Sequence, residues 1–419
     1  MERDKIAVVG LGYVGLPLAI AFSKKYKVTG FDIDELRVAE LNEGTDRTRE
    51  ITSEQLKASH NLQVTSDQAL LQKCNVYIIT VPTPLDANKS PDLSYLLSAS
   101  ATVAKYLQKD DIVIYESTVY PGCTEEDCVP VLEKVSGLVY NQDFYCGYSP
   151  ERINPGDKQR DITQIKKVTS GSTPEIAKSV DDLYAGIITA GTHLAPSIKV
   201  AEAAKAIENA QRDVNISFIN EVALIFDRMG IDTNDVLEAA ATKWNFISFK
   251  PGLVGGHCIS VDPYYLAAKA AKLGYQPKVI LSGREVNDRM GIFVAEKMLQ
   301  LLADIPFAER NKKRVLILGM AFKPNCADIR NTKVIDVYEV LKTSKVEVEI
   351  FDPWVDASIV KKELGIELIH APADVYDGII VAVGHDSFRQ LPFEQWKKGG
   401  AVIFDTQNIV ERHLVDGRL

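Results

Sequence analysis

The chain has 419 residues, of which 46% are hydrophobic and 25% are charged, and its formal net charge at pH 7 is −9. This length exceeds one ordinary hydrophobic core and predicts two or three domains in a soluble globular protein. The acidic balance argues against a nucleic-acid-binding surface, because phosphate backbones are bound by clustered Lys and Arg side chains.

The opening residues, "MERDKIAVVGLGYVG", lack the apolar core and the small-residue cleavage site of a signal peptide. No run approaches the roughly 20 apolar residues that are needed to span a bilayer. The six cysteines show no zinc-type CxxC pairing, which suits thiols that the cytosol keeps reduced. We therefore expect a cytoplasmic protein without a membrane segment or a metal site.

Residues 1–196 alternate short apolar strands with helices, beginning with the strand "KIAVVG" and the helix "LPLAIAFSKKY". The strand "KVTGFDID" follows, and further strands are expected at 76–82, 111–118 and 143–151. Strands and helices that alternate at this spacing predict a parallel sheet covered on both faces.

The turn after the first strand reads G-x-G-x-x-G at Gly10, Gly12 and Gly15, and Asp32 ends the next strand. In a dinucleotide-binding domain these glycines permit the tight turn, the approach of the pyrophosphate and the packing of helix on strand. An acidic residue about 20 positions further on binds the ribose hydroxyls and repels a 2′-phosphate, so NAD is expected rather than NADP. Arg37 could soften this preference.

From about Ser197 to Met229 the pattern changes to one long helix without internal Gly or Pro. Its apolar face is larger than one small domain would cover, which predicts a homodimer interface. Lys205, Asn209 and Arg212 share one face at i, i+4 and i+7, either as a solvated stripe or as a site. The alanine-rich sequence around Lys205 favours a packed cation that stabilises an alkoxide, with Asn209 donating to the same oxygen.

The stretch "GLVGGHCISVDPYYL" places Cys258 after two glycines and four residues before Asp262. The backbone N–H groups of the glycines would stabilise a thiolate or an oxyanion. A cysteine beside a dinucleotide site predicts oxidation of an alcohol or an aldehyde to an acid through a thiohemiacetal and a thioester. The alternative is a buried structural thiol.

From about Lys312 the plan of strand, turn, helix and strand returns in "RVLILGMAFKPN" and "VEVEIFDPW". The expected fold is α/β, with two Rossmann-like doubly wound domains joined by a long central helix. We place an NAD-binding domain at 1–196, a central helical domain with the dimer interface and the Cys258 loop at 197–305, and a second Rossmann-like domain at 306–419.

With these motifs the sequence resembles the UDP-glucose/GDP-mannose dehydrogenase family. The resemblance covers nearly the whole chain and is carried by "GLGYVGLPLA", "ITVPTP", "ESTVYPGCTEE", "YSPERINPGD", "KVAEAAKAIENAQRDVNISFINE", "KPGLVGGHCISVDPYYL" and "AFKPNCADIRNT". UDP-glucose and GDP-mannose members typically read GGSC at the cysteine. "GGHC" followed by "VDPYYL" is similar to the branch that oxidises C6 of UDP-N-acetylhexosamines, although many of its members have Pro at the position of Ser260.

The resemblance implies that Cys258 is the nucleophile, that Lys205 and Asn209 stabilise the oxyanion, and that Asp262 supports Lys205 and assists hydrolysis. Glu151 and Thr118 would hold the water and the nicotinamide side. Besides the glycine turn, the implied NAD contacts are Tyr13, Val14, Asp32, Arg37, Thr83, Thr118 and Arg330. The resemblance also implies that the Rossmann-like domain at 306–419 binds the UDP-sugar. The implied UDP-sugar contacts are Glu151, Arg152, Lys205, Asn209, Arg212, Phe249, Lys250, Gly255 and Lys323.

The implied reaction is the NAD-dependent four-electron oxidation of a UDP-N-acetylhexosamine to a uronic acid for a bacterial capsule or O-antigen. UDP-N-acetylglucosamine is the first choice, followed by UDP-N-acetylgalactosamine or UDP-glucose, since no residue identifies the C4 epimer. Two other classes stay open: a two-electron hydroxy-acid dehydrogenase in which Cys258 is structural, and a non-catalytic dinucleotide-binding scaffold. The complete set of Cys258, Lys205, Asn209 and Asp262 argues against the scaffold.

Overall fold

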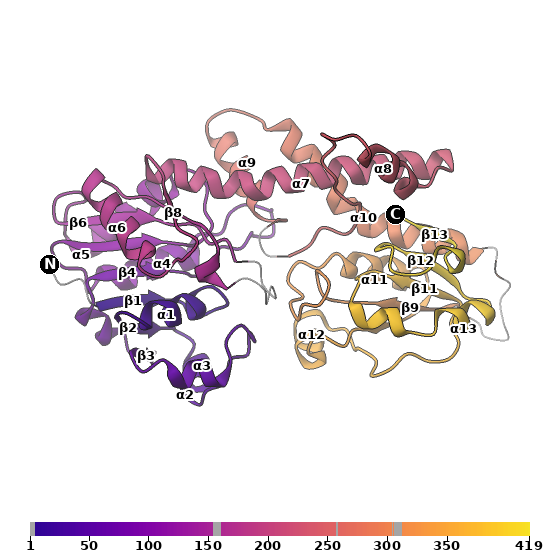
Figure 1. The fold of residues 1–419 in the computed structure, drawn as a ribbon, viewed down its shortest axis with the longest axis horizontal. Helices are drawn as coiled ribbons and strands as arrows, with labels where there is room; N and C mark the ends of the chain where they lie inside the picture. Colours follow the sequence, from indigo (N-terminus) through magenta and orange to yellow (C-terminus); the bar gives the residue numbers. More distant parts are fainter. Residues whose placement is uncertain (1–4, 154–160, 257–258, 304, 306–311) are drawn as a thin grey trace. The chain divides into compact units, whose positions relative to one another are not determined.

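The computed structural model describes residues 5–153, 161–256, 259–303, 305 and 312–419. His257 and Cys258 lie outside the described residues. By the proximity of its Cα atoms the chain forms two compact units, which Figure 1 shows in ribbon form. Unit 1 comprises Met1–Glu208 and Tyr264–Gln276, and unit 2 comprises Asn209–Pro263 and Pro277–Leu419. The division into three domains at 196 and 305 stays a prediction.

Unit 1 is built on a six-stranded sheet in the order β3-β2-β1-β4-β5-β6 with all neighbours parallel. The strands are β1 (Lys5–Val9), β2 (Lys27–Phe31), β3 (Leu62–Thr65), β4 (Val76–Ile79), β5 (Asp111–Tyr115) and β6 (Phe144–Tyr148). The helices are α1 (Gly15–Ser23), α2 (Glu35–Asn42), α3 (Ser53–Ala58), α4 (Ser94–Ala104), α5 (Val129–Ser136) and α6 (Pro174–Ala185). The strand order reverses between β1 and β4, and doubly wound sheets bind dinucleotides at such a point.

A second, two-stranded sheet in unit 1 pairs β7 (Lys167–Thr169) with β8 (Thr192–Leu194). It adjoins β6, because the Tyr148 N–H donates to the Ser170 carbonyl at 3.3 Å. The residues after β5 and β6 are thereby covered and buried, although they pair with no further strand of the large sheet.

Unit 2 contains the second Rossmann-like sheet, a parallel array in the order β10-β9-β11-β12-β13, which confirms the predicted fold class. Its strands are β9 (Arg314–Leu318), β10 (Glu347–Phe351), β11 (Gly378–Val381), β12 (Val402–Asp405) and β13 (Gly417–Arg418). The flanking helices are α11 (Val334–Thr343), α12 (Ala357–Leu364) and α13 (Phe393–Lys398). The central strands read as continuous apolar runs because helices bury both faces of the sheet.

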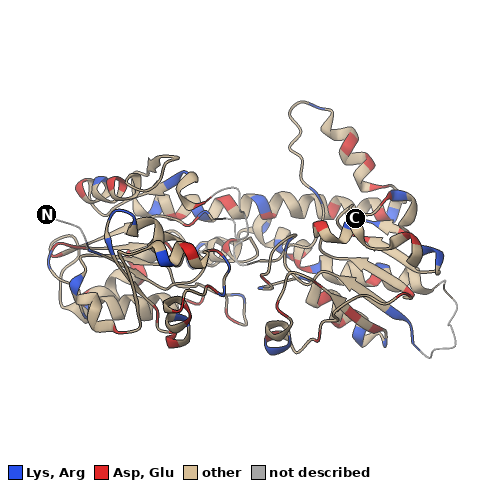
Figure 2. Cartoon of the chain, turned by 60° about the horizontal axis from the view of Figure 1, so that its bottom comes forward, with Lys and Arg blue, Asp and Glu red and all other residues tan. Residues whose placement is uncertain are grey.

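The predicted long helix is α7 (Ile198–Met229), and three more helices follow it: α8 (Thr233–Ala241), α9 (Asp262–Lys272) and α10 (Lys278–Ala303). Among the described residues, none of these helices is apolar over a stretch long enough to cross a membrane. Lys and Arg side chains are interspersed with Asp and Glu in both units, so the charge of −9 is not gathered in one segment (Figure 2).

A buried carboxylate ties α7 to the loop after β5. Glu202 is fully buried, and its side-chain oxygens accept hydrogen bonds from the N–H groups of Gly122 and Thr124 at 2.5 and 2.9 Å. Burial raises the pKa of Glu202 to about 7, although the two backbone donors favour the charged form. Between pH 4.5 and about 7 the folded protein therefore retains a proton on Glu202 that the unfolded chain has largely lost.

Replacing Glu202 with Gln should make the stability of the protein less sensitive to a rise in pH from 4.5 to about 7. Because the folded pKa of Glu202 is raised, its contribution to stability is present below the ordinary pKa of 4.5 and is lost as the pH rises to about 7. We expect the free energy of unfolding of the wild type, relative to Glu202→Gln, to fall by about 3 kcal/mol over this range. Urea unfolding at a series of pH values measures the difference.

The matched control for this experiment is Glu221→Gln, which changes an exposed glutamate of the same helix. Its free energy of unfolding should run parallel to that of the wild type at every pH. A Glu202→Gln curve that also ran parallel would contradict the raised pKa.

Candidate active site

The glycine turn between β1 and α1 has the geometry that a dinucleotide requires. Gly10 has φ +94°, a conformation that side chains strain, and a Cβ on Gly15 would lie 1.8 Å from the Gly10 carbonyl oxygen. Gly12 differs, because a Cβ there would meet nothing within 4 Å. The surface beside Gly12 is therefore open for a pyrophosphate to approach the backbone, and the turn fits NAD.

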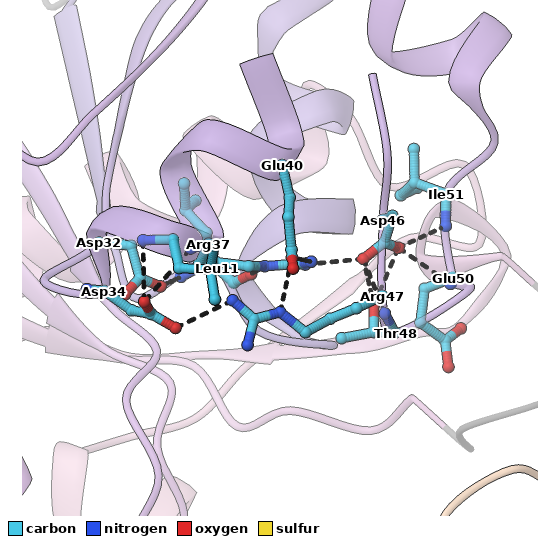
Figure 3. A network of polar contacts seen from close by, with 11 residues as sticks. Leu11, Asp32, Asp34, Arg37, Glu40, Asp46, Arg47, Thr48, Glu50 and Ile51 are labelled. Atoms are coloured by element: carbon cyan, nitrogen blue, oxygen red, sulfur yellow. Dashed lines mark hydrogen bonds and ion pairs between the residues drawn. The ribbon is translucent and has the colours of Figure 1, made fainter. Parts of the chain in front are cut away.

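The carboxylate of Asp32 lies at the end of β2, directly beside this turn. Its Oδ2 accepts the Leu11 N–H at 2.7 Å and its Oδ1 accepts the Asp34 N–H at 3.0 Å (Figure 3). Asp34 caps α2 by accepting the N–H groups of Leu36 and Arg37. Asp32 is thus held in the place from which a carboxylate binds ribose hydroxyls.

Arg37, predicted as an NAD contact, stabilises the glycine turn through a hydrogen bond to the carbonyl of Leu11 (Figure 3). Its guanidinium is buried, donating from Nε to the Leu11 carbonyl at 3.0 Å and from Nη2 to Asp46 Oδ1 at 2.7 Å. Burial opposes the ionisation of Asp46, but hydrogen bonds from Thr48 and Arg37 lower the pKa of this carboxyl below its ordinary value. Arg37 is therefore engaged with Leu11 and Asp46, which limits its capacity to attract a 2′-phosphate.

The remaining predicted cofactor residues fall into two groups. Tyr13 and Val14 precede α1, and Thr83 and Thr118 lie together at the carboxyl ends of β4 and β5, where Thr83 Oγ1 donates to the Thr118 carbonyl at 2.7 Å. Arg330 belongs to unit 2, where its Nε lies 3.0 Å from the carboxylate of Asp328.

Glu151 follows β6 and is buried among charged groups that sequence reasoning missed. Its Oε1 accepts the Ile153 N–H, and its Oε2 lies 3.9 Å from Nζ of Lys167. Lys167, on β7, donates to Glu116 Oε2 at 2.6 Å. The available signal was the position of Glu116 and Lys167 directly beside apolar strand residues, where a charged side chain must be paired if it is buried.

Arg152, predicted to contact the sugar nucleotide, is paired within unit 1. Its Nε donates to Glu208 Oε2 at 3.3 Å and its Nη1 to the Lys166 carbonyl at 2.9 Å. Glu208 lies on α7, so this pair joins the segment after β6 to the long helix.

Asp262 and Asn209, 53 residues apart in sequence, meet in unit 2. Asn209 Nδ2 donates to Asp262 Oδ2 at 2.5 Å, and both side chains are buried. The resemblance implied that Asp262 supports Lys205, and the described hydrogen bond shows that it also holds the Asn209 amide. Lys205, one turn earlier on α7, is only 5% exposed, so it is not part of a solvated stripe.

The two glycines before Cys258 are required by packing. A Cβ on Gly255 would lie 2.6 Å from the Asn331 carbonyl oxygen, and one on Gly256 would lie 2.7 Å from the Phe322 ring. The Gly256 N–H, which we expected to serve an oxyanion, instead donates to the Arg330 carbonyl at 3.2 Å. The expectation of an oxyanion donor is therefore wrong for Gly256.

Asn220 of α7 holds the same loop from its other side. Its Oδ1 accepts the Gly252 N–H at 2.8 Å, and its Nδ2 donates to the Gly252 carbonyl at 3.1 Å. Asn220 also donates to Asn287 of α10 at 2.8 Å. The backbone that leads to Cys258 is thus fixed by a buried amide and by the segment 322–331.

A cavity of about 150 Å³ opens at the carboxyl ends of β9, β11 and β12 in unit 2. It is lined by Leu253, Gly255, Ala321, Phe322, Lys323, Pro324, Thr332, Lys333, Val334, Ala382, Val383 and Gln407. Two predicted sugar-nucleotide residues, Gly255 and Lys323, therefore share one cavity with a second cation, Lys333. Phe249 is half-buried, whereas Arg212 and Lys250 are exposed.

A dinucleotide turn on one Rossmann-like sheet, and a cavity with two lysines on a second, define an NAD-dependent dehydrogenase with an anionic substrate. Three segments match the UDP-glucose/GDP-mannose dehydrogenase family: 4–188 its NAD binding domain, 199–289 its central domain and 316–412 its UDP binding domain. The chain belongs to this family, and NAD is its cofactor.

Named relatives cover the whole chain. The UDP-N-acetyl-D-glucosamine 6-dehydrogenase of Pseudomonas aeruginosa is 56% identical, with 100% of both chains covered. The enzyme of the same name from Salmonella typhi is 53% identical over 100% of this chain and 99% of its own. The structure of a UDP-D-ManNAc dehydrogenase from Pyrococcus horikoshii is similar at a TM-score of 0.89 and 32% identity, covering 99% of this chain and 98% of the other.

Proposed function

We propose that the protein oxidises the C6 hydroxyl of UDP-N-acetylglucosamine to a carboxylate, reducing two NAD for each sugar. The observation that carries the choice of sugar is the 56% identity, over the entire chain, to a protein named for this activity. The cavity with Lys323 and Lys333 supports an anionic diphosphate as part of the substrate.

The glycine turn and Asp32 would hold NAD, and two NAD molecules bound in succession would each supply an acceptor for one hydride. The Cys258 thiolate adds to the intermediate aldehyde and forms a thiohemiacetal, whose oxidation gives a thioester that water cleaves. Lys205 and Asn209 stabilise the oxygen that gains negative charge, and Asp262 orients the Asn209 amide. Glu151 and Thr118 hold the attacking water and the nicotinamide side.

The yield of NADH at completion with limiting sugar tests this proposal. Two NADH for each UDP-N-acetylglucosamine consumed are expected, and none from Cys258→Ala. A yield of one would contradict the thioester and favour the two-electron dehydrogenase. Parallel reactions with UDP-N-acetylgalactosamine and UDP-glucose test the sugar, because a faster reaction with either would overturn the first choice.

We also propose that the protein is a homodimer through the exposed apolar face of α7. Val200, Ile207, Phe218, Ile225 and Met229 are between 45% and 61% exposed, and their spacings of 7, 11, 7 and 4 residues place them on one face of the helix. Phe218→Asp should halve the mass in analytical ultracentrifugation. Ile359→Asp, an equally apolar exposed position on α12, is the control. An unchanged mass for Phe218→Asp would contradict this interface.

A further inference from the structure

Three ionisable side chains are buried together in unit 1 beside the proposed water site. Glu116 follows β5, Glu151 follows β6 and Lys167 begins β7, and they are 1%, 7% and 2% exposed. Lys167 Nζ lies 2.6 Å from Glu116 Oε2 and 3.9 Å from Glu151 Oε2. One ammonium thus faces two carboxylates, and it is hydrogen-bonded to only one of them.

Glu116 and Tyr184 fix the position of this ammonium. The Tyr184 hydroxyl, on α6, donates to Glu116 Oε1, and Lys167 Nζ lies 5.4 Å from the centre of the Tyr184 ring. Burial raises the pKa of Glu116; the Lys167 ammonium opposes this shift and the negative charge of Glu151 adds to it. The Glu116–Lys167 pair is therefore complete without Glu151.

A second buried carboxylate is costly in such a place, because it repels the first one and loses its hydration. A purely structural ion pair would be more stable with a neutral residue at position 151. Glu151 is nevertheless present, and only one of its oxygens is used locally, by the Ile153 N–H. Its Oε2 is buried without a hydrogen-bond partner among the described residues, so this oxygen can accept a further donor.

We propose that Lys167 is a positioning residue for Glu151 in the hydrolytic step, an inference that rests on the proposed function. The Lys167 ammonium places a positive charge 3.9 Å from Glu151 Oε2 in a buried setting, while its hydrogen bond to Glu116 keeps the ammonium from occupying that oxygen. That oxygen accepts a proton from the water that attacks the thioester. A C–O bond forms, the C–S bond breaks, and Cys258 leaves as a thiolate.

The charged and titratable groups that face Glu151 come from each element packed around it. They are Glu116 after β5, Lys167 on β7 and Tyr184 on α6, with Arg152 beside it paired to Glu208 of α7. The inference therefore makes opposite predictions for the two partners of the ion pair. Replacing Lys167 with a neutral residue removes a positive charge from beside Glu151, whereas replacing Glu116 removes a negative one.

The test is the pH dependence of steady-state turnover, after a burst of NADH that reports the two oxidations before hydrolysis. Lys167→Met should shift the acid limb upward by about 1 pH unit, and Glu116→Gln should shift it downward by a similar amount. Both variants should keep the burst of two NADH for each active site. Lys167→Arg should restore the wild-type limb, and Lys166→Met, at the exposed neighbouring lysine, should leave it unchanged.

The role of Lys167 would be overturned if the acid limbs of Lys167→Met and Glu116→Gln both matched the wild type, or if both shifted in the same direction. If Lys167→Met fails to fold, as its thermal melt would show, the near-isosteric Glu116→Gln still tests the downward shift. A wild-type protein that yields one NADH for each sugar would instead overturn the proposed function. A wild type with two NADH and variants with unshifted limbs would overturn this inference alone.

Discussion

Replacing Gly255 with Ala is expected to lower kcat/KM by about 100-fold, because a displacement of about 1 Å at reacting groups costs that much. The added Cβ would lie 2.6 Å from the Asn331 carbonyl oxygen, a backbone atom that cannot rotate away. The loop must therefore move, and the segment that it displaces leads directly to Cys258. Initial rates with UDP-N-acetylglucosamine over a range of concentrations measure the loss.

Gly252→Ala is the matched control, since it adds the same methyl group three residues earlier in the same loop. The nearest atom to its Cβ would be Gln407 Nε2 at 3.8 Å, an ordinary van der Waals contact. Because the added methyl group displaces no atom, we expect this variant to keep kcat/KM within about 3-fold of the wild type, a change of less than about 0.7 kcal/mol. Full activity in Gly255→Ala would show that contact with Asn331 does not set the position of the loop.

The cofactor turn could be predicted from the sequence because its signals are local. Gly10, Gly12, Gly15 and Asp32 lie within 23 residues; Gly10 and Gly15 are required by the backbone of the turn, and Gly12 leaves its surface open to a ligand. The strand positions were also recognisable, but their ends were not: β5 stops at Tyr115, whereas we expected it to reach 118. Glu116 and Ser117 are buried by segments distant in sequence, so burial there does not indicate pairing with a strand.

Residues whose role depends on distant partners could not be predicted from periodicity. The ion pair of Lys167 with Glu116 joins positions 51 residues apart. Without knowledge of a partner, a lysine is expected to be exposed. Arg37 was recognised as important, but its contact with Asp46 depends on how the segment after α2 folds back. Such pairings follow from the topology, which a helical or strand period does not encode.

Replacing Asp262 with Ala is expected to lower kcat by 100- to 1,000-fold, about the effect of removing one donor from an oxyanion site. Asp262 Oδ2 accepts the Asn209 Nδ2–H at 2.5 Å, and both groups are buried, so the amide loses this hydrogen bond when the carboxylate is removed. In the proposed function Asn209 donates to the oxygen that gains charge. A freely rotating amide would have to be reordered in each transition state. The kcat of Asp262→Ala, Asn209→Ala and the double variant measures this coupling.

The double variant separates two ways in which Asp262 can act. If Asp262 acts through Asn209, the kcat of the double variant should be close to that of the less active single variant. Residues that act as a unit give non-additive losses. Asp227→Ala, at an exposed carboxylate near the end of α7, is the control and should retain full activity. If the fold-loss in kcat of the double variant equals the product of the two single losses, the coupling is contradicted. Asp262 would then have a role of its own, such as assistance to the attacking water.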